Sequence, residues 1–316
     1  MIKYHPLEDV LDIYIENLDL KHKTVRDYKL LLNRYIYYLK SRNIRYAKRS
    51  DIITYRDSMW EEDLSATTIQ KQMVIIRNFY KWIRINRKFY HFEEIYEHDV
   101  SEGLKGAKIE KNYKKEALTL SEAQALIELS KSKVGTMFGL RNYAILLLML
   151  TTGLRTIEVA RAKRRDLSTI DKHDVLYVQG KGKDGSDMFV KISKPVKAVI
   201  QEYLFLRSDK NKFLFITNHQ KETVKPITTD TIRYSLKRLM DEAQVSSPKV
   251  TVHSLRHTCA TLSLQTGGSL EATQQLLRHA NIETTLIYAH HLNRIKDDTV
   301  DRISNYLFQE KEEEEC

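Results

Sequence analysis

Apolar side chains recur every three or four residues along most of the first hundred positions. The segment TVRDYKLLLNRYIYYLK shows the pattern clearly. This spacing places the apolar side chains on one face of an α-helix. It predicts helices over residues 7–20, 24–40, 51–63 and 65–84, with Thr24 as the N-cap of the second helix. We therefore expect an all-α domain over residues 1–103.

The rest of the chain is mostly helical in pattern, with one clear β signal. Residues 140–150 (LRNYAILLLML) are almost wholly apolar, which predicts a buried core helix. The runs VLYV and MFVKI flank the polar segment QGKGKDGSD, an arrangement typical of a β-hairpin. Thr119 or Ser121 is expected to cap an earlier helix, with support from Glu122. Further helices are predicted over residues 195–207, 229–243, 254–266, 270–278, 282–289 and 293–309.

Residues that interrupt regular structure are few, with ten glycines and four prolines. We therefore predict a mainly α protein with a small β-hairpin or sheet, whose second domain is mixed α/β and covers residues 117–292. Residues 104–116 are predicted to be a basic linker, either a solvated loop or a strap along a DNA backbone. Residues 293–316 are predicted to form a last helix and an acidic tail. The linker lysines that would contact DNA are Lys105, Lys108, Lys111, Lys114 and Lys115.

The net charge of +10 and the pI near 9.3 favour a polyanionic partner, although a basic protein without a nucleic-acid role is an alternative. The two cysteines, Cys259 and Cys316, provide neither a disulfide framework nor metal-ligand spacing. No apolar run approaches the roughly 20 residues that span a bilayer. The first residues, MIKYHPLEDV, lack the apolar core of a signal peptide. We therefore expect a cytoplasmic protein near the nucleoid, without membrane association.

The second domain carries a series of residues suited to phosphate chemistry. To cleave a phosphodiester, a side chain must be deprotonated, the phosphoryl charge neutralised and the leaving oxygen protonated. Arginine suits the second task because its planar fork stays charged and grips two oxygens. Arg155 follows Gly153 at a helix start, where free N–H groups also favour an anion, and Arg256 lies three residues after His253. The candidate catalytic residues are Arg155, Lys181, His253, Arg256, His279 and Tyr288.

The roles of the remaining candidates stay open on the residues alone. His253 or His279 could accept a proton from tyrosine or donate a hydrogen bond to a phosphate oxygen. Lys181, in the hairpin turn, is a candidate general acid, and Lys183 competes for that role. Tyr288 has an ordinary pKa of about 10, so it needs cationic neighbours or a base to attack. The other histidines, His257, His290 and His291, are expected to be structural.

The motifs GLRTIEV, the GKG hairpin, HSLRHTCAT and LLRHANIETTLIYAH occur in one order between about residues 117 and 290. In this order they resemble the catalytic domain of the tyrosine recombinases, the phage-integrase-type recombinases. The segment KTVRDYKLLLNRYIYYL is similar, more weakly, to the core-binding domain of that family. The resemblance implies a two-domain protein that clamps DNA in a C shape.

The resemblance also implies a role for each residue. Arg155 and Arg256 would clamp the scissile phosphate, and His253 would act as general base. His279 would bond a phosphate oxygen, Lys181 would protonate the leaving 5′ hydroxyl, and Tyr288 would form a 3′-phosphotyrosine bond. Glu158 looks like the supporting acid of the family. The family usually has glycine where this chain has Arg278; we expect the arginine to be tolerated at a helix end and to add a phosphate contact.

In the same way, the resemblance implies strand exchange through a Holliday junction without metal, cofactor or ATP. The expected partners are double-stranded DNA with inverted-repeat core sites, three further copies of the chain on two such sites, and an accessory directionality protein. The helix after Tyr288 would dock either on a neighbouring protomer or on its own domain. The DNA-facing helices are expected within residues 65–84 and 229–243. Their exposed candidates for DNA contact are Gln70, Lys71, Arg77, Arg233 and Lys237.

The leading functional hypothesis is a site-specific recombinase that integrates and excises a mobile element or resolves DNA dimers. One alternative is a strand-passage enzyme similar to type IB topoisomerases, which use a similar tyrosine and cationic set. The other is a DNA-binding regulator that has kept the fold and lost the reaction.

Overall fold

The computed structural model describes residues 5–109, 116–179, 188–217 and 224–279, together with 281–283, 285–286, 302–304 and 306. The chain divides into two compact units, Met1–Asn112 and Tyr113–Cys316, called here the N-terminal and C-terminal units. The predicted boundaries around the linker stay a prediction, because residues 110–115 lie outside the described ones. None of the helices in the described parts combines the length and apolar character needed to cross a membrane.

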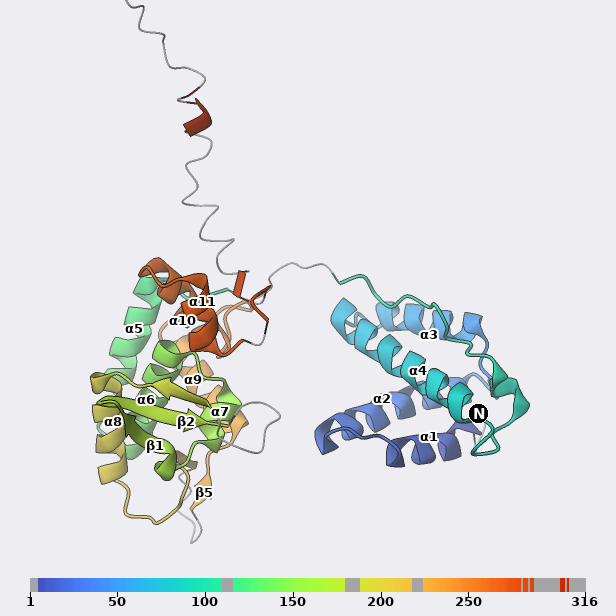
Figure 1. Cartoon of the computed structure of the whole chain (residues 1–316), viewed down its shortest axis with the longest axis horizontal. Coiled ribbons are helices and arrows are strands. Elements are labelled where there is room, and N and C mark those ends of the chain that lie inside the picture. The colour runs from blue at the N-terminus through green and yellow to red at the C-terminus, as the bar shows by residue number, and fades with distance from the viewer. Residues whose placement is uncertain are drawn as a thin grey trace, which may run out of the picture. The chain divides into compact units, whose positions relative to one another are not determined.

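The N-terminal unit is built around α4, which buries Ile69, Met73, Ile76, Phe79 and Ile83 along one face. Ser65 caps this helix by accepting a hydrogen bond from the Thr68 N–H at 3.3 Å. The other three helices pack against α4 or its neighbours, and a short 3-10 helix, Glu94–Glu97, closes the unit (Figure 1). All four predicted helices are therefore present. Their bounds are α1 Leu7–Glu16, α2 His22–Ser41, α3 Arg49–Glu61 and α4 Ala66–Asn86.

Two details of the N-terminal helices differ from the prediction. The first helix ends at Glu16, because the Asn17 side chain bonds back to the Ile13 carbonyl oxygen at 2.8 Å and starts a turn. The second helix begins at His22, so Thr24 lies inside its first turn and Lys21 takes the N-cap position. In both cases apolar spacing alone could not fix the boundary.

The C-terminal unit is organised around α6, Met137–Thr152, whose residues from Leu140 onward are mostly buried, as the apolar run predicted. The helices α5, α8, α9 and α10 all contact it. Thr119 caps α5, and Glu122 completes the capping box, as expected. At one end of the unit α10 and α11 pack against each other (Figure 1). The remaining helices are α5 Leu120–Lys131, α7 Thr156–Arg161, α8 Lys194–Phe205, α9 Thr229–Glu242, α10 Ser254–Gln265 and α11 Leu270–Leu277.

The predicted hairpin is part of a three-stranded antiparallel sheet in the order β1-β2-β3. Strands β2 (His173–Val178) and β3 (Met188–Lys191) pair with Val178 opposite Met188, which confirms the hairpin. The edge strand β1 (Leu167–Ile170) was not predicted. Asp171 and Lys172, which connect it to β2, both have positive φ, as a tight hairpin turn requires, but lack the usual Asn-Gly signature. A smaller pair, β4 (Ile216–Thr217) and β5 (Lys225–Pro226), was also missed.

Candidate active site

Arg155 sits at the junction between α6 and α7. Gly153 ends α6 in the left-handed conformation, with φ 60°, and turns the chain so that Arg155 becomes the N-cap of α7. The Arg155 N–H, expected to face an anion, donates to Glu158 Oε2 at 2.8 Å. The anion at this helix start is therefore the protein's own carboxylate. The Arg155 side chain remains 29% exposed and can reach a ligand.

Glu158 has no exposed surface and gathers donors from two distant segments. Its Oε1 accepts from Arg155 Nη1 at 3.0 Å, and its Oε2 accepts from Arg278 Nη2 at 3.0 Å. A buried carboxylate needs such partners, because an unpaired charge in the interior is costly. Glu158 therefore fixes both Arg155 and the end of α11, which agrees with its expected supporting role.

Arg256 is 2% exposed and is held by backbone carbonyl oxygens. Its two terminal nitrogens donate to the carbonyl oxygens of Gly153 and Leu277. One is two residues before Arg155, and the other is two residues before His279. The Arg256 guanidinium thus joins three segments: the start of α10 with His253, the turn before Arg155, and the end of α11 before His279.

The histidines are held in the neutral form by burial and by this positive charge. Burial first, and then the charges of Arg256 and Arg155, lower the pKa of His253, although the residue is exposed at the surface. Burial, with Arg256, Arg155 and Arg278 after it, lowers the pKa of His279 to about 4. A neutral His253 can accept a proton, as a general base must.

His253 and His257 contact each other edge to face, with ring centroids 4.8 Å apart. His257 is buried, and its pKa falls to about 4, mainly through burial and then through His253 and Arg256. The sequence predicted a structural role for His257, and its contact with His253 was not anticipated. The missed signal is the four-residue spacing from His253, which brings the rings together at the start of α10.

His279 lies just beyond α11, and its Nδ1 is 2.9 Å from the Thr285 hydroxyl oxygen. When that hydroxyl donates to Nδ1, the proton of the neutral ring is on Nε2, where it can be donated to a phosphate oxygen. Arg278, which precedes it, was expected to add a phosphate contact. The structure corrects this expectation: the Arg278 side chain is 4% exposed and is bonded to Glu158 and to the Leu276 carbonyl oxygen.

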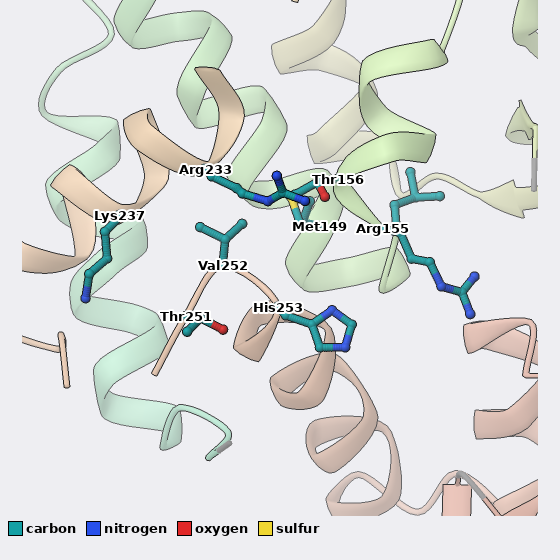
Figure 2. Close-up of a pocket in the computed structure, with 9 residues that line it drawn as sticks. Met149, Arg155, Thr156, Arg233, Lys237, Thr251, Val252 and His253 are labelled. Atoms are coloured by element: carbon teal, nitrogen blue, oxygen red, sulfur yellow. The ribbon is translucent and has the colours of Figure 1, made fainter. Parts of the chain in front are cut away.

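A cavity of about 430 Å³ opens beside Arg155 and His253. Figure 2 shows four of its lining side chains: Arg155 at the start of α7, His253 before α10, and Arg233 and Lys237 on α9. Two of the predicted DNA-contacting residues thus share a cavity with two of the candidate catalytic residues. Arg233 is exposed, and its Nη1 lies 2.7 Å from Asp230 Oδ1. The cavity is cationic and is open to a polyanion.

In the N-terminal unit, Lys71, Lys105 and Lys108 are exposed, as a DNA-contacting role requires. Arg77 was expected to be exposed, and this was wrong: it is half-buried and donates to the Leu104 carbonyl oxygen at 3.1 Å. Gln70 is also half-buried, beside Gly106. Both lie under residues 104–107, which pack back onto α4 through apolar side chains. Some of the residues that the sequence singled out lie outside the described part of the chain, so the structure says nothing of them. They are Lys111, Lys114, Lys115, Lys181, Lys183, Tyr288, His290 and His291.

Comparisons with known proteins agree on one family. Residues 116–294 match the phage integrase family, and residues 11–86 match the N-terminal SAM-like domain of phage integrases. The chain is 28% identical over 303 residues to the tyrosine recombinase XerD of Listeria innocua, covering 92% of this chain and 96% of the relative.

Two solved structures show the same fold. A post-cleavage complex of the site-specific recombinase XerH with a palindromic difH substrate matches with a TM-score of 0.69 and 20% identity, over 89% of this chain and 79% of that one. A lambda integrase tetramer bound to a Holliday junction matches with a TM-score of 0.67 and 16% identity, over 89% and 76%. The chain therefore belongs to the phage integrase family and is a site-specific tyrosine recombinase, an enzyme that cuts and rejoins DNA.

Proposed function

We propose that Arg155 and Arg256 bind the scissile phosphate, that Tyr288 attacks it to form a 3′-phosphotyrosine, and that Lys181 protonates the leaving 5′ oxygen. His253 accepts the tyrosine proton, and His279 donates a hydrogen bond to a phosphate oxygen. The observation that carries this proposal is the network through which Glu158 and Arg256 join α7, α10 and the end of α11. Fixed cations of this kind stabilise charge that develops in a transition state.

The two neutral histidines support the assignment of proton transfers. A histidine beside two arginines loses its proton easily, so His253 is available as a base at neutral pH. The covalent phosphotyrosine conserves the energy of the broken phosphodiester, so that rejoining requires no external energy source. A 5′ hydroxyl from the partner strand then attacks the phosphotyrosine and releases Tyr288.

Duplex DNA is the substrate in this proposal, with contacts from both units. Arg233 and Lys237 line the cavity beside Arg155, which supports a phosphate or groove contact next to the scissile bond. Lys71, Lys105 and Lys108 supply contacts from the N-terminal unit, and the remaining linker lysines continue them. The helical unit thus acts as a core-binding domain and residues 117–292 as the catalytic domain. The C-shaped arrangement stays a prediction.

Strand exchange requires two DNA sites, so we propose a tetramer that acts through a Holliday junction on inverted-repeat core sites. The likeness to a lambda integrase tetramer bound to such a junction supports this assembly. Deletion of residues 293–316 tests whether the last helix docks between protomers. Loss of assembly on paired sites with single-site binding retained supports docking on a neighbour, and unchanged assembly excludes it.

The first experiment traps covalent complexes on fragmented genomic DNA from the host under denaturing conditions and sequences the attached ends, with Tyr288→Phe as control. Adducts at a few inverted-repeat sites that vanish in the control support the proposal. Sites at the ends of a mobile element would indicate integration and excision, and a site near the replication terminus would indicate dimer resolution. Scattered adducts would indicate a topoisomerase-like enzyme, and binding without adducts would indicate a regulator.

A further inference from the structure

Arg278 holds an uncommon backbone conformation. It follows α11 with φ 54° and ψ 45°, the left-handed region that L-residues other than Asn and Asp seldom adopt. Glycine would avoid the steric cost at this helix end. Strained residues persist where the surrounding structure determines them strongly, and they cluster at functional sites. We therefore expect contacts of the Arg278 side chain to offset the steric cost of its backbone conformation.

That side chain is directed inward onto the support of Arg155. Its Nη2 donates to Glu158 Oε2 at 3.0 Å, and its Nη1 donates to the Leu276 carbonyl oxygen at 2.8 Å. Arg155 Nη1 bonds the other oxygen of the same carboxylate at 3.0 Å. Glu158 thus lies between two guanidinium groups, one buried and one partly exposed.

The division of the two carboxylate oxygens decides what Arg155 can do. An arginine beside a carboxylate favours a two-pronged contact that uses both oxygens. Here Oε2 already accepts from Arg278 and from the Arg155 backbone N–H. Only Oε1 remains for the Arg155 guanidinium, so its other N–H groups are left for a phosphate. Without Arg278, the buried charge of Glu158 would draw the Arg155 fork inward.

The backbone of the same residue lies within the Arg256 contacts. Leu277, immediately before Arg278, accepts a hydrogen bond from Arg256, and His279 follows immediately after it. Arg256 also bonds the Gly153 carbonyl oxygen, two residues before Arg155. Side chain and backbone together close a ring of contacts through Arg155, Glu158, Arg278 and Arg256.

We propose that Arg278 is a positioning residue of the recombination site. Its guanidinium donates to Glu158 Oε2 and so leaves N–H groups of the Arg155 guanidinium free to bind the scissile phosphate. Its left-handed backbone sets the direction in which the chain continues to His279. The role rests on the proposed function, in which Arg155 and His279 contact that phosphate. In this proposal Arg278 acts through Glu158 and the backbone before His279, and not through a contact of its own with the substrate.

The test compares Arg278→Gly and Arg278→Lys with the full-length wild type on the DNA site that the covalent trapping identifies. Glycine removes the side chain and suits the backbone, whereas lysine keeps a charge but reaches only one acceptor. Gln244→Gly is the matched control, because Gln244 has φ 59° after α9, is exposed and lies outside the ring of contacts. Single-turnover adduct formation at saturating protein and the Kd for the site are measured for each variant, with thermal unfolding to confirm the fold.

We expect Arg278→Gly to form the adduct about 10- to 100-fold more slowly, with the Kd for DNA within about threefold of wild type. Arg278→Lys should recover part of the rate, and Gln244→Gly should match wild type. A lysine variant no faster than the glycine variant contradicts the role of the charge. If the glycine variant does not fold, Arg278→Lys is compared with wild type, and an unchanged rate of adduct formation overturns the proposal.

A double-mutant cycle with Glu158→Gln identifies the route of the effect. If Arg278 acts through Glu158, the double variant is about as slow as the slower single variant. Multiplied losses would show that Arg278 acts elsewhere and would overturn the proposal, as would a wild-type rate in Arg278→Gly. Wild type that forms no adduct removes the proposed function and this role with it. An adduct unaffected by Arg278→Gly removes this inference alone.

Discussion

The two units hold their positive charge in different ways. In the N-terminal unit two of the ion pairs lie at the surface: Lys71 Nζ is 2.9 Å from Asp27 Oδ2, and Lys29 Nζ is 3.0 Å from Asp12 Oδ1. All four side chains are largely exposed. In the C-terminal unit Arg256, Arg278 and Glu158 are almost completely buried and are bonded to one another's segments.

We interpret this difference as a division of roles, with exposed cations suited to binding DNA and buried ones suited to holding the reaction site in place. Exposed pairs contribute little to stability, and their cations can turn toward a phosphate at small cost. Buried pairs incur a large desolvation cost, so they are poor devices for stability alone. What they provide here is fixed geometry beside the cavity that Arg155 and His253 both line. The N-terminal core contains aromatic packing instead. The centroid of the Tyr14 ring lies 5.1 Å from that of Phe79 and 5.2 Å from that of Trp82.

Glu158→Gln is expected to have the largest effect. Neutralising this carboxylate leaves Arg155 and Arg278 without their shared counter-charge, and the loss for a buried pair is about 3–5 kcal/mol of unfolding free energy. Adduct formation should fall by about 100-fold, because Arg155 loses its orientation. Urea unfolding and single-turnover cleavage check both. The matched change in the N-terminal unit, Asp27→Asn, should alter neither the free energy of unfolding nor the rate of adduct formation. Equal losses in the two variants would show that the two units do not differ in this way.

Gly153→Ala should have the next largest effect, and Gly103→Ala provides its control. Both glycines have positive φ, 60° and 66°, so alanine costs each about 1–2 kcal/mol. A Cβ on Gly153 would also lie 2.4 Å from Leu277 Cδ2, whereas one on Gly103 would meet nothing within 4 Å. The fully buried Leu277 side chain must shift, next to the contact between Arg256 and the Leu277 carbonyl oxygen. Cleavage should therefore slow about tenfold in Gly153→Ala only. Equal cleavage by both variants would show that the network tolerates displacement.

The same contrast explains what the sequence could predict. Helices with long apolar faces and standard caps were found, as at Ser65 and Thr119, because those signals are local. Strand β1 was missed because Asp171 and Lys172 form its turn without glycine or asparagine. The identity of the candidate site residues followed from motif order. Their arrangement did not, since Glu158 and Arg278 are 120 residues apart and their ion pair leaves no local pattern.

Acid should weaken the histidine-rich site at the start of α10. His257 and His279 have pKa values of about 4 in the folded protein, below the unfolded value near 6.5. The unfolded chain therefore binds more protons between these values, and stability present above about pH 6.5 is lost as the pH falls toward 4. His257→Gln should reduce the loss between pH 7 and pH 5 by about 2 kcal/mol in urea unfolding. An unchanged pH dependence would show that His257 is protonated without strain in the fold.

Lys71→Ala is expected to have the smallest effect and to change only the affinity for DNA. Lys71 is exposed, and its partner Asp27 is exposed too, so stability and single-turnover cleavage at saturating protein should not change. If α4 faces DNA, loss of one phosphate contact reduces the slope of log Kd against log salt by about one. Arg233→Ala should change that slope and also slow cleavage, because Arg233 lines the cavity beside Arg155, where the proposed function places the scissile phosphate. Titrations of the core site at several salt concentrations separate the two variants. A full wild-type slope for Lys71→Ala would move the DNA surface of the N-terminal unit away from this part of α4, and cleavage slowed by Lys71→Ala would mean that the surface charges of this unit also shape the reaction site.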